Sequence, residues 1–154
     1  MKIRNWQIIV VIICIVLGTL LHFTYEWSGE NKFVALFSAV NESTWEHLKL
    51  AYYPMLIMAI IGHFVIGEKS NNYWFAQAIG IIVAMVFITV FFYTYTGVIG
   101  TNYDVLNIGS FIIAILLGQY VAYRILISSQ KYNAEIISIV FLILLLLMFL
   151  IYTF

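Results

Sequence analysis

The sequence predicts an all-α integral membrane protein: a five-transmembrane-helix bundle with a short interfacial or re-entrant segment before the second helix. Composition points to a membrane, because 64% of the 154 residues are hydrophobic, 9% are charged, and the mean hydropathy is +1.04. A soluble domain carries about 25% charged residues. Seven acids and seven bases are too few to cover a water-facing surface. The apolar residues also fall into five long runs.

Each of the five runs is long enough to cross a hydrocarbon core of roughly 30 Å, which takes about 20 helical residues. Short polar or flexible stretches separate the runs, and the chain has no long linker. We therefore expect a single transmembrane domain over residues 1–154. The expected helices are about 6–25, 44–66, 73–98, 105–127 and 134–153.

The first run is expected to be a retained helix rather than a cleaved signal peptide. The apolar stretch within residues 1–24 is longer than the 7–15 residues of a signal core, and no small-residue cleavage site follows it. The next apolar piece, "KFVALFSAV" (32–40), is too short to cross a bilayer. We interpret it as the interfacial or re-entrant segment that leads into the second helix.

The second helix has clear start signals. Asn41 is a favoured N-cap residue, and Ser43 followed by Glu46 fits a capping box, in which side chains satisfy backbone N–H groups of the first turn. Glu46 and Lys49, three residues apart, are placed to form an ion pair on one helix face. Pro54 lies inside the helix, where it removes a backbone donor and favours a kink.

The third and fourth helices carry small residues at every fourth position, a spacing that lets two helix backbones approach closely in lipid. The two small-residue stripes are Ala76, Gly80 and Ala84 in the third helix, and Ser110, Ala114, Gly118 and Ala122 in the fourth.

The fifth helix consists almost entirely of large aliphatic residues, and we expect much of its circumference to face lipid.

The distribution of basic residues predicts the orientation, since loop lysines and arginines favour the cytoplasm. With the amino terminus inside, only Lys32 and Lys49 lie on the outer side. We predict a multi-pass protein of the cell membrane with a cytoplasmic amino terminus. Zero net charge and the lack of a basic cluster argue against nucleic acid as a partner. The expected partner is the lipid bilayer. The basic residues expected inside are Lys2, Arg4, Lys69, Arg124 and Lys131.

Ionisable side chains gather where the first helix ends and the second begins, on the expected outer side. Charged groups at membrane depth are costly, so they indicate function by default. His22 and Glu26 come level with the start of the second helix, Ser43 lies one turn before His47, and Asp104 arrives from the third loop. The candidate ligand-binding residues are His22, Glu26, Glu42, Ser43, Glu46, His47 and Asp104.

The leading hypothesis is an outward-facing His/carboxylate pocket that binds a cation, a metal or a small polar solute. Imidazole nitrogen and carboxylate oxygen suit a divalent metal such as zinc, with His22, Glu46 and His47 as candidate ligands, although no fixed-spacing metal motif is present. One alternative is a lipid-surface hydrolase, metal-dependent or serine-dependent, with Ser43 near His47. Another is a structural or partner-binding subunit that uses the fourth-helix stripe in a homo-oligomer. The sequence singles out no catalytic residue. Helix capping alone explains much of the polar pattern at the start of the second helix.

Residues 41–54, "NESTWEHLKLAYYP", resemble the signature of an uncharacterised family of small bacterial polytopic membrane proteins. In that family a similar N-E-S-x-W-E-H-x-K segment precedes an aromatic pair and a proline, and the likeness extends over the whole chain in length and hydropathy. The resemblance implies a polytopic membrane fold and brings no particular activity with it. The positions that it marks are Asn41, Glu42, Ser43, Trp45, Glu46, His47, Lys49 and Pro54.

Overall fold

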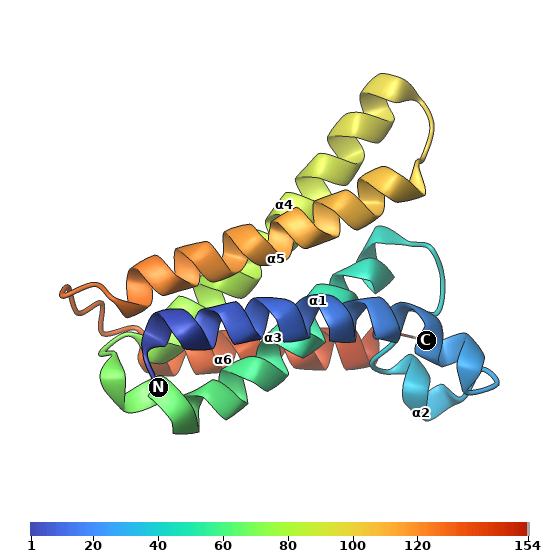
Figure 1. Ribbon diagram of the computed structural model, residues 1–154. Helices are drawn as coiled ribbons and strands as arrows, with labels where there is room; N and C mark the ends of the chain where they lie inside the picture. The colour runs from blue at the N-terminus through green and yellow to red at the C-terminus, as the bar shows by residue number, and fades with distance from the viewer. Residues whose placement is uncertain (154) are drawn as a thin grey trace.

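The computed structural model describes residues 1–153, which form six α-helices, one short 3-10 helix and no strand (Figure 1). The amino and carboxyl termini lie at opposite ends of the bundle. Four helices, α1, α3, α4 and α5, are long and apolar enough to cross a membrane. The elements are α1 (Ile3–Trp27), α2 (Lys32–Ala35), α3 (Thr44–Ile66), η1 (Gly67–Lys69), α4 (Tyr73–Ile99), α5 (Asp104–Leu126) and α6 (Glu135–Ile151).

The all-helical class predicted from the sequence is confirmed, and the expected helix bounds agree within three residues at every end. The expected number of five spanning helices is not confirmed, because α6 has 17 residues and is shorter than the four long helices. The segment 32–40 forms the short helix α2 over its first four residues.

α4 and α5 form a closely packed hairpin through their small residues. A Cβ on Gly80 would lie 2.7 Å from the carbonyl oxygen of Gly118, and one on Gly118 would collide with the carbonyl oxygen of Gly80. The packing interpretation of the stripes is therefore confirmed. Because α4 of the same chain covers the α5 stripe, this stripe offers no free surface to an oligomer. The stripe residues Ala76, Gly80, Ala84, Ser110, Ala114, Gly118 and Ala122 are all buried.

α3 is the central helix, and α1 packs against it near the carbonyl group that Pro54 leaves without a helical hydrogen bond. A proline has no N–H to donate to the carbonyl four residues earlier, which here belongs to Leu50. A Cβ on Gly18 of α1 would lie 2.5 Å from that carbonyl oxygen. The missing side chain of Gly18 thus lets α1 approach the backbone of α3 where the helix lacks a hydrogen bond.

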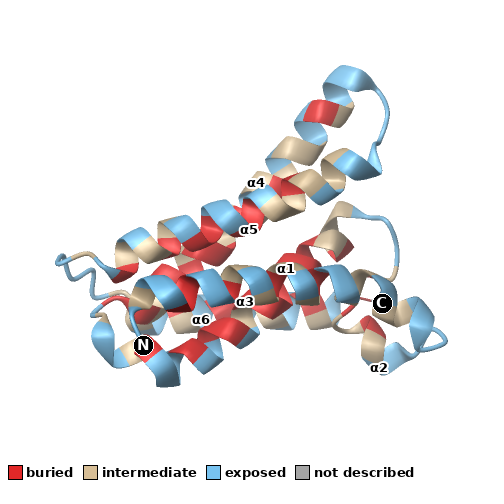
Figure 2. Ribbon diagram, in the orientation of Figure 1, coloured by how far each residue is buried: buried red, intermediate tan, exposed pale blue. Residues whose placement is uncertain are grey.

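α6 is attached to the bundle along one side, and its other side is exposed (Figure 2). The carboxylate of Glu135 accepts hydrogen bonds from the first N–H groups of α4, at 2.9 and 3.3 Å. Farther along, the hydroxyl of Tyr52 donates to the carbonyl of Leu142 at 2.6 Å, and its ring lies 5.0 Å from that of Phe149. Most other large side chains of α6 are exposed, as the aliphatic composition predicts.

Replacing Gly118 by Ala is expected to lower the stability of the α4–α5 hairpin, because the added methyl group meets backbone that cannot move aside. The matched control is Gly109→Ala on the same helix, where an added Cβ meets nothing within 4 Å. Overpacking of this kind destabilises by about 1–3 kcal/mol. Thermal unfolding in detergent should show a lower midpoint for Gly118→Ala alone. Equal midpoints for the two variants would contradict the close approach.

Candidate functional site

Side chains near the start of α3 accept hydrogen bonds from backbone N–H groups of the same segment. These bonds hold the residues around the first turn in place. The hydroxyl of Ser43 accepts a hydrogen bond from the backbone N–H of Glu46 at 3.3 Å, so Ser43 is the N-cap and one half of the predicted capping box is present. Asn41 lies before the cap and accepts from the N–H of Ser43 at 2.9 Å. The carboxylate of Glu46 does not return to Ser43. It accepts instead from the N–H of Val40 at 3.1 Å.

Glu46 and Lys49 form a buried ion pair with a nitrogen–oxygen distance of 2.7 Å. Their side chains are 3% and 0% exposed, so the predicted pair exists but lies in the interior. The Lys49 ammonium also donates to the carbonyl of Ala35 at 3.2 Å and to the hydroxyl of Thr153 at 2.8 Å. A lysine ammonium has three donors, and all of them are satisfied here.

These contacts hold three separate segments together: the linker after α2, the first turn of α3 and the end of the chain after α6. A second anchor is Ser38, which is fully buried and contacts the last turns of α1. Its hydroxyl donates to the carbonyl of Leu21 and accepts from the N–H of Tyr25 at 3.1 Å. The residues that follow Ser38 are thereby held against the carboxyl-terminal end of α1.

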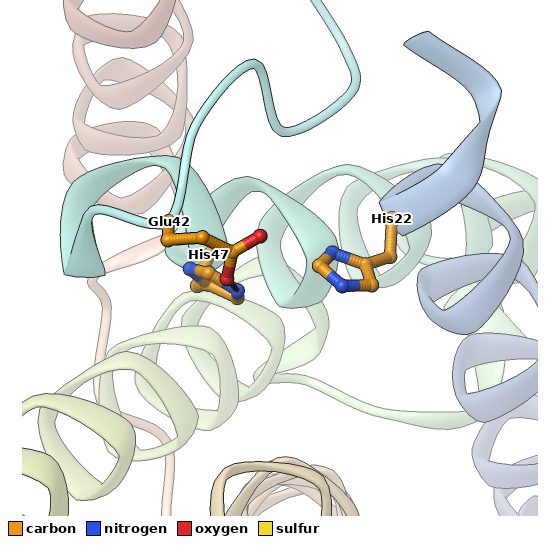
Figure 3. A group of neighbouring side chains, drawn as sticks. All are labelled: His22, Glu42 and His47. Atoms are coloured by element: carbon orange, nitrogen blue, oxygen red, sulfur yellow. Dashed lines mark ion pairs between the residues drawn. The ribbon is translucent and has the colours of Figure 1, made fainter. Parts of the chain in front are cut away.

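The linker places Glu42 beside His47 of α3, and His22 of α1 faces this pair (Figure 3). One ligand atom from each of the three residues lies within 4.8 Å of the others. The Nε2 atom of His47 is 3.3 Å from a carboxylate oxygen of Glu42. The two imidazole rings are 5.4 Å apart between centroids. Both histidines are half-buried and Glu42 is exposed, so the cluster opens to the surface.

The hydrogen bond that His47 makes through Nδ1 leaves its Nε2 atom facing the carboxylate of Glu42. Its Nδ1 lies 2.9 Å from the carbonyl oxygen of Ser43. A carbonyl only accepts, so Nδ1 carries a proton. In a neutral ring Nε2 then presents a lone pair to the carboxylate of Glu42, and two acceptors face each other. A proton or a metal ion between them removes this repulsion. The Nδ1 atom of His22 is buried and has no hydrogen-bond partner among the described residues.

A hollow of about 200 Å³ lies beside the cluster, between α1 and the linker. Glu26 lines it together with His22 and Glu42, which brings three of the predicted residues to one opening. The rest of the lining is Phe23, Tyr25, Ala39, Val40 and Asn41.

Two of the predicted residues lie elsewhere. Glu46 points into the interior toward Lys49, so Glu42 takes the place of Glu46 beside the two histidines. The reason is that Glu46 and His47 are consecutive residues of α3, so their side chains leave the helix about 100° apart, and Glu46 faces the buried ammonium of Lys49. Asp104 begins α5, at the tip of the α4–α5 hairpin, which points away from the carboxyl-terminal end of α1 and the start of α3 (Figure 1).

The chain belongs to the family described as "Family of unknown function (DUF6512)", whose model matches residues 1–154. This confirms the expectation of an uncharacterised family. No curated protein and no solved structure matches the chain. The comparisons therefore bring no activity, and the function has to be inferred from the site.

Lys49→Met is expected to destabilise the protein by about 3–5 kcal/mol, because it leaves the carboxylate of Glu46 buried without a counter-charge. The matched control is Lys32→Met, which removes an exposed lysine. The double variant Glu46→Leu with Lys49→Met removes both charges and should recover much of the loss. Thermal unfolding in detergent measures all three. A midpoint for Lys49→Met equal to that of Lys32→Met would show that the pair is not buried in the folded protein.

Proposed function

We propose that the protein binds a divalent metal ion, such as zinc, through His22, Glu42 and His47. The observation that carries the proposal is that one ligand atom from each residue lies within 4.8 Å of the others. Tetrahedral zinc takes such ligands at about 2.0–2.2 Å, which puts neighbouring ligand atoms roughly 3.3–3.5 Å apart. The 3.3 Å separation of His47 and Glu42 already has this value. Rotation of the His22 side chain brings its ligand atom into the third coordination position.

The surroundings of His47 support the same proposal. A metal-binding histidine usually donates its other ring N–H to a carbonyl or a carboxylate, which fixes the tautomer and the ring orientation. The carbonyl of Ser43 accepts this hydrogen bond from Nδ1. Nε2 is thereby the free ligand atom, and it is the atom that faces Glu42. Glu26, at the rim of the hollow, adds negative charge that attracts a cation.

We further propose five membrane crossings, with the amino terminus cytoplasmic and the metal site at the outer interface of the cell membrane. The opposite positions of the two termini support an odd number of crossings (Figure 1). The 17 residues of α6 extend about 25 Å, which is near the lower limit for a spanning helix. In this orientation five of the seven lysines and arginines lie on the cytoplasmic side.

The second candidate function is a metal-dependent hydrolase that acts at the lipid surface. Three protein ligands leave a fourth position on zinc for water, as in hydrolytic zinc sites. A serine-dependent mechanism has less support. The hydroxyl of Ser43 accepts from the N–H of Glu46, and the nearby ring nitrogen of His47 faces the carbonyl of Ser43 rather than its hydroxyl.

Titration of the purified full chain with zinc chloride tests the metal site. His22→Ala, Glu42→Gln and His47→Ala should each weaken zinc binding at least about 10-fold, because each removes a ligand. The matched control is His63→Ala, which removes an exposed histidine at the other end of α3 and should leave the affinity unchanged. Acidification should also weaken binding, because protons compete for the ligand atoms.

Equal losses of zinc affinity in His47→Ala and His63→Ala, or no zinc binding by the unaltered protein, would overturn the proposed metal site. A panel of phospholipids assayed with and without zinc then separates the two candidate functions. Hydrolysis that requires both zinc and His47 supports the hydrolase. Zinc binding without any hydrolysis supports a binding protein.

A further inference from the structure

A second cavity, of about 340 Å³, lies between α1 and α5 at the opposite end of the bundle from the histidine cluster. Its wall is apolar over most of its length, and polar side chains stand at the end toward the amino terminus. A ligand site has this combination of apolar walls and a few polar groups. The lining residues are Arg4, Gln7, Ile8, Val11 and Ile12 of α1, and Leu116, Gln119, Tyr120 and Tyr123 of α5.

Two glutamines in this cavity are buried without hydrogen-bond partners. Gln7 is 6% exposed and Gln119 is 2% exposed. Neither amide atom of Gln7, and not the amide oxygen of Gln119, has a hydrogen-bond partner among the described residues. An unpaired buried amide costs several kcal/mol in an apolar environment. A polar group that enters the cavity would supply the missing partners after a small rotation of these side chains.

The charge of the cavity is positive. Arg4 lines it and has no ion-pair partner within residues 1–153, and no acidic residue belongs to the lining. A second cation stands at the rim, because Arg124 donates to the hydroxyl of Tyr120 at 3.0 Å and lies over its ring at 5.9 Å. Basic pockets between membrane helices bind anionic lipid head groups.

We propose that this cavity binds an anionic phospholipid whose head group carries hydroxyls, of the phosphatidylglycerol class. The phosphate pairs with Arg4, and the head-group hydroxyls donate to the amide oxygens of Gln7 and Gln119, which have almost no exposed surface and have to rotate toward the cavity. The acyl chains lie along the apolar wall. A zwitterionic choline lipid fits less well, because it adds a cation beside Arg4 and has no hydroxyl to donate. This site does not depend on the proposed metal site.

Thermal unfolding of the full chain in mild detergent, with added lipid, tests the proposal. Phosphatidylglycerol should raise the midpoint by about 5 °C or more at saturation, and phosphatidylcholine with the same acyl chains should not. Arg4→Gln should abolish the shift. The matched control is Lys131→Gln, which removes an exposed charge at the same end of the bundle and outside the cavity, and it should keep the shift.

Gln7→Leu separates a lipid site from a purely structural role. It removes the unpaired amide, so the midpoint without lipid should rise while the shift caused by phosphatidylglycerol shrinks. Equal shifts with both lipids, or equal losses in Arg4→Gln and Lys131→Gln, would overturn the proposal. A shift of the same size with soluble glycerol phosphate would show that the cavity binds a free phosphate and not a lipid.

Discussion

The arrangement around the start of α3 depends on the buried ion pair between Lys49 and Glu46. The ammonium of Lys49 has three acceptors, from the last residue of α2, from α3 and from the end of the chain after α6. The carboxylate of Glu46 also holds the N–H of Val40. In an apolar interior each charge needs these partners, because an unpaired ion there is very costly. The pair therefore fixes where the linker runs, and the linker carries Glu42.

The histidine cluster follows from this constraint, since His22 comes from a helix distant in sequence and Glu42 from the linker that leads into α3. His22 belongs to α1 and His47 to α3, and the path of the linker brings Glu42 beside His47, where His22 faces the pair. The two proposed sites lie at opposite ends of α1, which carries His22 at one end and Gln7 at the other. Between them Gly18 holds α1 against α3 at the carbonyl that Pro54 leaves free.

The sequence predicted the helices well, because long apolar runs and the signals around Ser43 determine them directly. It identified His22, Glu42 and His47 as candidates, yet grouped Glu46 with them. That grouping failed because Glu46, although next to His47 on α3, faces the interior and pairs with Lys49. The depth of Lys49 was not predictable, because an acid and a lysine three residues apart usually form a surface pair. Its partners Ala35 and Thr153 are 14 and 104 residues away, so only the folded chain brings them together.

Zinc affinity in the double variant Glu46→Leu with Lys49→Met tests the central claim most directly. The variant removes the pair without leaving a buried charge, and neither residue touches the proposed metal position. If the pair positions Glu42, zinc affinity should fall about 10-fold or more while the protein remains folded. Unchanged affinity in the folded variant would show that the cluster forms without the pair, and the positioning role of Lys49 and Glu46 would be contradicted.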